Sequence, residues 1–151
     1  MEKNNLTFRE VTEQDYAFLI ALRRATMNPH YIKMGKTPDE QINAQRVLDH
    51  YESTPIIVLE GVSVGMVKAF SEGSDWILSQ IQVKADYQGR GIGTAVVKQI
   101  IDTAPENTKG VRLSVLKGNR AIKLYQRLGF KIAEEGDSFY RLLFQLDLSK
   151  K

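Results

Sequence analysis

The sequence contains no cysteine, so disulfide bonds, cysteine metal sites and a cysteine nucleophile are all excluded. Its two histidines, His30 and His50, do not lie in a spacing typical of metal ligands, and we expect no metal. No apolar run approaches the roughly 18 residues that a membrane-spanning helix needs. The first residues do not join a basic segment to an apolar one, so no secretory signal is expected. These absences predict a cytoplasmic protein that works in a reducing compartment.

The chain also has little excess charge, because it contains 21 basic and 18 acidic residues and so has a net charge of +3. The basic residues are spread along the chain, whereas a nucleic-acid-binding surface would need them clustered. Hydrophobic residues make up 42% and charged residues 26%, as in ordinary globular domains. We therefore expect one domain over residues 1–151 that binds neither nucleic acid nor a membrane.

Hydrophobic periodicity predicts the order β-α-α-β-β-β-α-β-α-β-β. Thr12 and Thr37-Pro38 are typical helix starts, and Gly129 is a typical residue just past a helix end. The fold class that follows is α/β, with one mixed, mostly antiparallel sheet of about seven strands and helices on both faces. The expected strands are 6–11, 56–60, 65–70, 76–83, 111–116, 130–134 and 139–148, and the expected helices begin near 12, 37, 94 and 120.

A glycine-rich segment, Gln88-Gly89-Arg90-Gly91-Ile92-Gly93, follows the strand predicted at 76–83 and precedes a helix. Glycines let consecutive backbone N–H groups turn toward one ligand without interference from side chains. The unpaired N–H groups and the positive dipole end of the following helix face the same point. The segment therefore predicts a binding site for a phosphate or pyrophosphate group.

A second motif lies further along, Asn119-Arg120-Ala121-Ile122-Lys123-Leu124-Tyr125-Gln126-Arg127-Leu128-Gly129-Phe130. The two motifs together resemble the GNAT superfamily of N-acetyltransferases, whose acyl-CoA loop reads Gln/Arg-x-x-Gly-x-Gly/Ala. The predicted order of elements matches that fold along nearly the whole chain. The resemblance implies transfer of an acetyl group from acetyl-CoA to a primary amine by direct attack. It leaves the acceptor open, as a small-molecule or peptide amine, and homodimers are common in the family.

The resemblance also implies roles for individual residues. Backbone groups of the fourth strand would pair with pantetheine, and the glycine loop would hold the pyrophosphate. Asn119 would bind pantetheine or cap its own helix, and Tyr125 would give a proton to the departing CoA thiolate. The implied cofactor contacts are Ile81, Gln82, Val83, Gln88, Gly89, Arg90, Gly91, Ile92, Gly93, Thr94, Asn119 and Tyr125, with Tyr125 as the catalytic acid.

One feature departs from the family pattern, because many members carry a glutamate on the fourth strand as the base. Here the strand has Gln80 and Gln82 and no carboxylate, and neither amide accepts a proton usefully. A water relay, or a carboxylate or histidine from the early helices, are the alternatives. His30 and Tyr31 are expected between the first two helices, where the family commonly forms its acceptor pocket, and His30 is a candidate substrate contact. The missing carboxylate also motivates a second hypothesis, a non-catalytic acyl-CoA-binding sensor.

Plainer interpretations accompany several of these residues. Tyr125 shares helical spacing with apolar neighbours and could be a core aromatic. Arg90, Lys117, Arg120 and Lys123 form either a solvated basic face or a group that screens the CoA phosphates. A nucleotide-binding domain of another class is disfavoured, because the loop lacks the Lys-Ser/Thr ending of a P-loop.

Overall fold

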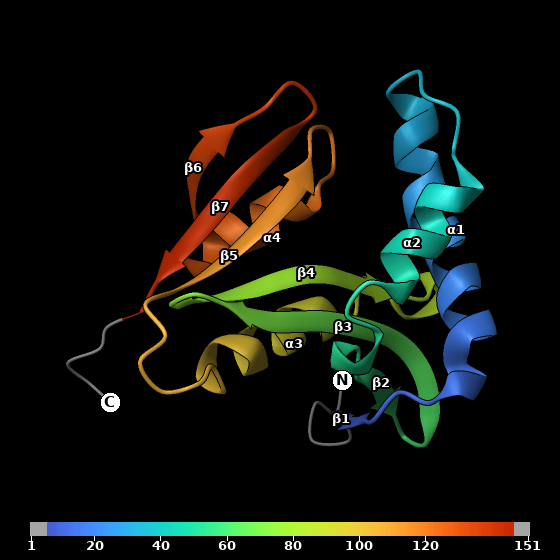
Figure 1. The fold of residues 1–151 in the computed structure, drawn as a ribbon, viewed down its shortest axis with the longest axis horizontal. Coiled ribbons are helices and arrows are strands. Elements are labelled where there is room, and N and C mark those ends of the chain that lie inside the picture. Colours follow the sequence, from blue (N-terminus) through green and yellow to red (C-terminus); the bar gives the residue numbers. More distant parts are fainter. Residues whose placement is uncertain (1–5, 147–151) are drawn as a thin grey trace. The chain divides into compact units, whose positions relative to one another are not determined.

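The computed structural model describes residues 6–146 (Figure 1). Helices and strands follow the predicted order, with three short 3₁₀ helices added: η2 (Glu13–Asp15), η3 (Tyr51–Ser53) and η4 (Ala85–Tyr87). Among the described residues, no helix has the length and apolar character to cross a bilayer. The strands are β1 (Leu6–Arg9), β2 (Ile56–Leu59), β3 (Val62–Glu72), β4 (Asp75–Val83), β5 (Gly110–Leu116), β6 (Lys131–Glu135) and β7 (Phe139–Gln145), and the α-helices are α1 (Tyr16–Lys33), α2 (Glu40–Leu48), α3 (Ile92–Asp102) and α4 (Ala121–Leu128).

The strands form one seven-stranded sheet in the order β1-β2-β3-β4-β5-β7-β6. The pairs β1–β2, β2–β3, β5–β7 and β6–β7 are antiparallel, and β4–β5 is parallel. The β4–β5 pairing covers three residues of each strand and has its last pair at Ile77 and Arg112. The predicted mixed α/β fold with seven strands is confirmed.

Backbone contacts group the chain into two compact units, each made of two segments. The first unit comprises residues up to Lys68 together with Gln80–Ala95, and the second comprises Ala69–Ser79 and the chain from Val96 onward. Strands β3 and β4 and helix α3 each contribute residues to both units.

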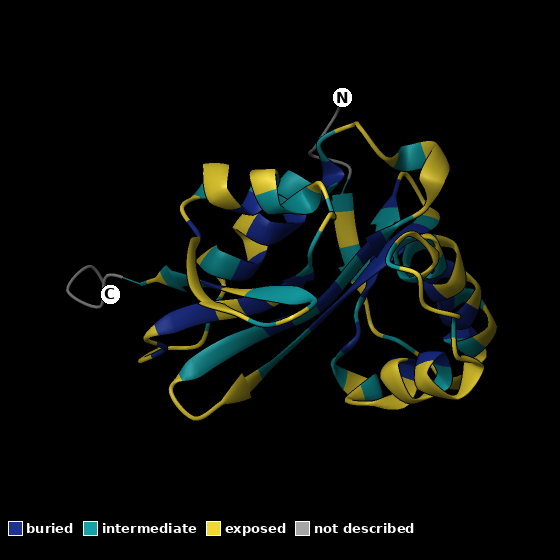
Figure 2. Cartoon of the chain, turned by 90° about the horizontal axis from the view of Figure 1, so that it is seen from above, coloured by how far each residue is buried: buried dark blue, intermediate teal, exposed yellow. Residues whose placement is uncertain are grey.

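The first unit has an apolar core between its two α-helices and β2 and β3. Leu19, Leu22 and Val47 from the helices pack with Ile56 and Met66 from the strands, and all five are buried. Figure 2 shows dark blue along central strands and on parts of the helices, whereas much of the helix surface is yellow. The buried face of α1, with Leu19 and Leu22, therefore packs on β2 and β3.

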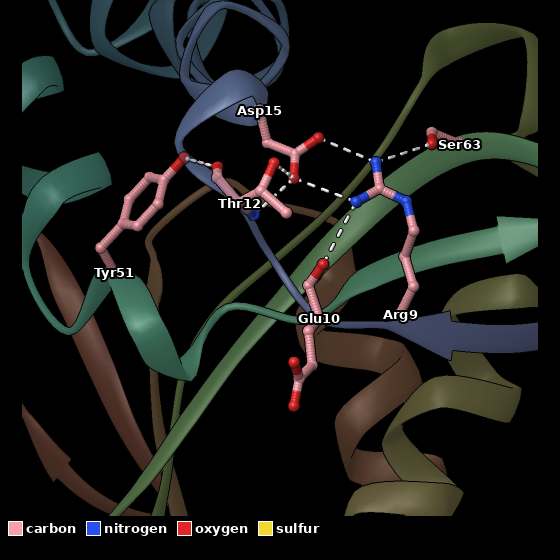
Figure 3. Close-up of polar contacts among 6 residues, drawn as sticks. All are labelled: Arg9, Glu10, Thr12, Asp15, Tyr51 and Ser63. Atoms are coloured by element: carbon pink, nitrogen blue, oxygen red, sulfur yellow. Dashed lines mark hydrogen bonds and ion pairs between the residues drawn. The ribbon is translucent and has the colours of Figure 1, made fainter.

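A salt bridge fixes the start of α1 in the same unit (Figure 3). The Arg9 guanidinium donates to both carboxylate oxygens of Asp15, at 2.8 and 3.0 Å. Asp15 also accepts from the backbone N–H of Thr12 at 2.8 Å, and Tyr51 donates to the Thr12 carbonyl at 2.6 Å. The hydrogen bond from Arg9 lowers the pKa of Asp15 to about 2. Thr12 and Asp15 therefore begin the first helical segment, as the sequence predicted.

The second unit packs α4 and the β5–β7–β6 strands around aromatic residues. The Tyr125 and Phe130 rings meet edge to face with centroids 5.7 Å apart, and Phe130 also packs against Phe144. Gly129 ends α4 in the left-handed region with φ 113°, and a Cβ there would lie 2.9 Å from the Phe144 ring. Only glycine meets both demands, so the predicted helix end at Gly129 is confirmed.

Several predicted boundaries were wrong. Helix α1 continues through Pro29 to Lys33, so His30 and Tyr31 lie inside it and not between the first two helices. Asp39, not Thr37, caps α2, because its carboxylate accepts from the backbone N–H groups of Gln41 and Ile42. An ionised carboxylate is a strong acceptor at a helix start, which explains the later beginning. Strand β7 ends at Gln145, and residue 148 lies outside the described residues.

Candidate active site

The glycine loop that joins β4 to α3 lies in the first unit. Gly89 and Gly91 adopt left-handed conformations with φ of 78° and 80°. A Cβ at position 89 would meet nothing within 4 Å, so the backbone conformation itself favours glycine there. Left-handed residues alternating with right-handed ones turn successive N–H groups into a shared concavity that binds anions.

The N–H groups of this loop are free of competing backbone partners. Helix α3 begins at Ile92, and its first backbone hydrogen bond runs from Ala95 N to the Gly91 carbonyl at 3.1 Å. Within residues 6–146, none of the N–H groups from Gly89 to Thr94 donates to another backbone or side-chain group. The start of α3 therefore presents several unpaired donors at the positive end of the helix dipole.

Side chains of the glycine loop contact the end of β4 and the segment that follows it. Gln88 Nε2 donates to the Val83 carbonyl at 2.9 Å. The exposed Arg90 guanidinium lies 4.9 Å from the centroid of the Tyr87 ring.

An apolar pocket of about 320 Å³ lies beside the loop, within the first unit. Its lining includes Phe18, Leu22 and Ala25 of α1, together with Lys84 and Gln88 from the segment between β4 and α3. The arrangement suits a ligand that joins an apolar stem to a phosphate group.

Buried polar side chains surround Gln80 on β4, a feature that the sequence analysis missed. Arg23 on α1 is 2% exposed, and its Nε donates to Asn43 Oδ1 at 2.9 Å. Its Nη1 lies 3.4 Å from Gln80 Oε1, which also accepts from Gln82 at 3.4 Å. Gln80 Nε2 donates to the Arg46 carbonyl at 2.8 Å. Gln80 is therefore fixed by partners from both early helices.

Lys68 on β3 is a second buried cation, with 0% exposure. Its ammonium group donates to the carbonyls of Arg46, Val47 and Asp49, where α2 ends. These carbonyls carry the negative end of the helix dipole. Burial is the main cause that lowers the pKa of Lys68 to about 8. Nothing in the sequence distinguishes Arg23 and Lys68 from surface cations, because their partners are distant along the chain.

Tyr125 and Asn119, two residues of the second motif, lie in the second unit. Tyr125 is 6% exposed, and burial raises its pKa to about 12 because the phenolate loses its hydration. The phenol therefore stays protonated through the neutral range. Asn119 Oδ1 accepts from the Ala121 N–H at 2.9 Å and so caps α4.

The other charged residues considered from the sequence either contact neighbours within the chain or are exposed. Lys117 forms an ion pair with Glu135 and lies over the Tyr140 ring, so its charge is used within the second unit. Arg120 and Lys123 are exposed. His50 contacts Asp49 at 3.1 Å. In the part of the chain that the structure describes, no three histidine, aspartate or glutamate side chains gather as a metal site would require.

Comparison with known proteins places these features in a family. The model of the acetyltransferase (GNAT) family matches residues 18–130, which include the glycine loop and the second motif. The chain belongs to this family. The resemblance stated from the two motifs is thereby confirmed.

Individual acetyltransferases agree with that assignment. The chain is 29% identical over 145 residues to a spermine/spermidine N(1)-acetyltransferase of Bacillus subtilis, with 88% of this chain and 92% of that protein covered. It is 33% identical over 76 residues to a thialysine N-epsilon-acetyltransferase of Bos taurus. That match covers 49% of this chain and 45% of the bovine protein, so the chain spans less than half of that relative.

Solved structures share the GNAT fold. An acetyltransferase from Thermus thermophilus superposes with a TM-score of 0.75 at 21% identity, covering 94% of this chain and 97% of that one. A PaiA N-acetyltransferase from Thermoplasma acidophilum, solved in complex with coenzyme A, gives a TM-score of 0.73 at 15% identity, covering 93% and 99%.

Proposed function

We propose that the protein transfers an acetyl group from acetyl-CoA to a primary amine by direct attack of the amine on the thioester. The observation that carries this proposal is the row of unpaired N–H donors from Gly89 to Thr94 at the start of α3. Such a row matches the oxygens of a diphosphate, which lies between the adenosine and pantetheine parts of coenzyme A.

The cofactor contacts proposed for this chain follow the motif residue by residue. The loop residues Gln88, Gly89, Arg90, Gly91, Ile92, Gly93 and Thr94 would hold the diphosphate. Backbone groups of Ile81, Gln82 and Val83 would pair with the pantetheine amides, which need partners once they leave water. The apolar pocket beside Gln88 supports this assignment, since pantetheine carries methyl and methylene groups between its amides.

Tyr125 is proposed as the acid that protonates the CoA thiolate as it leaves. With its pKa raised to about 12, the group holds its proton at any physiological pH, so that a proton is present for transfer to the thiolate. Asn119 would add a contact through its free amide nitrogen, since its oxygen caps α4.

A water molecule is proposed to accept the proton that the attacking amine must lose. Gln80 and Gln82 are both buried on β4, and neither amide can accept a proton usefully. The side chain of Gln82 makes one hydrogen bond among the described residues, from its Nε2 to Gln80 Oε1. Its carbonyl oxygen would therefore be available to orient a water molecule or the amine itself.

The acceptor class rests on the relatives. The names of the Bacillus subtilis and Bos taurus proteins point to spermine, spermidine and thialysine, all of which carry primary amines. We propose that the two units act together as one catalytic domain over residues 1–151, in the cytoplasm, where acetyl-CoA meets small amines and peptides. A homodimer is the assembly to test first, by light scattering.

A panel of amines with acetyl-CoA, followed by release of free thiol, tests the activity. Turnover of at least one amine is expected, together with CoA binding in calorimetry. The missing carboxylate on β4 favours a second function, an acyl-CoA-binding sensor. Tight CoA binding without product from any amine would favour the sensor and overturn the enzymatic proposal.

A further inference from the structure

Arg23 is a buried cation whose hydrogen-bond partners are all neutral. Its guanidinium donates to Asn43 Oδ1, to Gln80 Oε1 and, at 3.2 Å, to the hydroxyl of Tyr31. None of the carboxylates in the described part of the chain forms an ion pair with it. Buried charges in proteins are normally paired, because an isolated one is costly to remove from water. The site around Arg23 therefore has an excess of positive charge.

Neighbouring groups add to that charge. Burial is the main cause of the lowered pKa of Lys68, and the Asp49 charge opposes it. The Arg46 and Arg23 charges lower this pKa further, and the Arg46 charge also acts on Arg23. Glu40 forms an ion pair with the exposed Arg24 and accepts from Asn43. The Arg23 guanidinium itself has no anionic partner among the described residues.

Hydrogen-bond donors remain unused at the same place. A guanidinium has five N–H donors, and Arg23 makes three hydrogen bonds to the described residues. The Tyr31 hydroxyl accepts from Arg23, and its own proton has no acceptor among residues 6–146. Tyr31 is partly exposed, so it connects the buried guanidinium to the surface. Two N–H groups of the buried guanidinium and the O–H group of Tyr31 thus have no acceptor among residues 6–146, and they match a ligand with two acceptor oxygens.

The position of this donor group links it to the proposed reaction. Gln80 joins Arg23 to β4, and Gln82 follows on the same face of that strand, two residues on. An amine oriented by Gln82 would therefore lie near the guanidinium. Given the acetyl transfer proposed above, we infer that the acceptor is a primary amine that also carries a carboxylate, and that Arg23 and Tyr31 bind this carboxylate.

The preferred acceptor of this chain would then differ from the polyamines for which some relatives are named. A second ammonium group, as in spermidine, would meet the buried positive charge of Arg23, which has no anionic partner among the described residues, and would be repelled. A carboxylate would supply the missing counter-charge. An amino acid, or the end of a peptide with both groups near each other, fits this pattern.

Matched acceptors test the inference on the unmodified protein. We would measure kcat/KM for L-leucine against L-leucinamide, for β-alanine against β-alaninamide, and for spermidine. The carboxylates should be preferred by about tenfold or more, since hydrogen bonds to charged groups have roughly twice the strength of neutral ones. The amides carry the less basic and hence less protonated amine, so amine reactivity alone would favour them. Equal or better turnover of the amides or of spermidine would overturn the inference.

Single substitutions show which residues cause the preference for a carboxylate. Tyr31→Phe removes one hydroxyl and is expected to raise KM for the carboxylate about tenfold, with a smaller change for the carboxamide. Arg23→Gln should abolish the preference, whereas Arg24→Gln, its exposed neighbour, should leave the preference intact. If Arg23→Gln does not fold, Tyr31→Phe still decides. A carboxylate preference unchanged in Tyr31→Phe would assign the carboxylate to other residues and refute the role of this pair.

Failure of the proposed activity can be told apart from failure of this inference. If no amine is acetylated, the enzymatic proposal falls, and calorimetry with the same compounds and CoA still tests the carboxylate site. Binding of L-leucine or β-alanine that exceeds that of the amide, and that weakens in Tyr31→Phe, would support the site. Equal binding of both members of each pair would overturn it.

Discussion

Gly65 on β3 lies so close to Gln82 on β4 that a Cβ at position 65 would overlap the backbone carbonyl oxygen of Gln82. The same Cβ would lie 3.1 Å from the Cα of Val83. Both neighbours are backbone atoms, which cannot rotate away as a side chain could. Gly65 therefore sets how closely the end of β4, with its proposed pantetheine contacts, approaches β3.

Gly65→Ala should push the end of β4 away from β3. We expect a loss of about 2 kcal/mol or more in the free energy of unfolding, with weaker CoA binding in calorimetry. Ser71→Ala, an exposed position of the same strand, is the control and should change neither quantity. A Gly65→Ala protein with the stability and CoA affinity of the original would show that the strands separate without cost.

Gly91→Val should abolish CoA binding, because a branched side chain would enter the space proposed for the diphosphate and the residue would resist a φ of 80°. Gly61→Val is a matched control, since Gly61 has a φ of 82° in the turn between β2 and β3. Both variants should lose about 1–2 kcal/mol of stability from the backbone strain alone. Only Gly91→Val should lose CoA affinity, and retained binding would remove the loop from the cofactor site.

Tyr125→Phe should lower kcat by roughly 100-fold or more while CoA affinity stays close to that of the unmodified protein, because general acid catalysis contributes at least that much. Removal of a hydroxyl leaves the ring and its packing against Phe130 in place. Stopped-flow thiol detection and calorimetry measure the two quantities. An unchanged kcat would make Tyr125 a core aromatic, the plainer interpretation of its spacing.

Lys68 should make stability rise with pH in the mildly alkaline range. Its pKa is about 8 in the folded protein, against 10.5 in the unfolded chain, so between these values the unfolded state binds the extra proton. The stability it contributes is present above pH 10.5 and is lost as the pH falls through 8. From pH 8 to 10 the free energy of unfolding should therefore rise by about 2 kcal/mol relative to Lys68→Met. Parallel curves for the two proteins in urea titrations would contradict the assignment.

Asp15→Asn should lower the free energy of unfolding at neutral pH. The unmodified protein should lose the same contribution only in acid, when Asp15 becomes protonated. The folded pKa of Asp15 is about 2, below the unfolded value of 3.8, so its contribution is present above pH 3.8 and is lost as the pH falls through 2. We expect the variant to be about 1–2 kcal/mol less stable at pH 7, with a difference that shrinks below pH 3, because Arg9 is partly exposed and screened. Asp86→Asn, at an exposed aspartate, is the control. A difference that persists unchanged at pH 2 would point to a cause other than the ion pair.

The order of elements could be predicted because apolar residues recur with clear helical and strand periods. The loop geometry could be predicted as well, since Gly89, Gly91 and Gly129 occupy left-handed conformations that other residues rarely adopt. In each case the cause is local to a few neighbouring residues, and local causes are visible in a sequence.

The buried cations could not be predicted for the opposite reason. Arg23 donates hydrogen bonds to Asn43 and Gln80, which lie 20 and 57 residues away in the sequence. Lys68 donates to carbonyl groups at the end of α2. A lysine or arginine between apolar residues is usually exposed, and only tertiary partners overrule that expectation. The extension of α1 past Pro29 was missed because proline normally marks a boundary, whereas here the helix tolerates it.

Three elements, β3, β4 and α3, start in one unit and finish in the other. No single cut in the polypeptide can therefore release either unit with its secondary structure whole. Exchange of the first unit, which holds the proposed acceptor site, between this chain and a relative would need both of its segments to be transplanted at once, with junctions inside strands where register must be preserved. Selectivity in this protein is for that reason expected to change by point substitutions on α1 and α2 more readily than by recombination of modules.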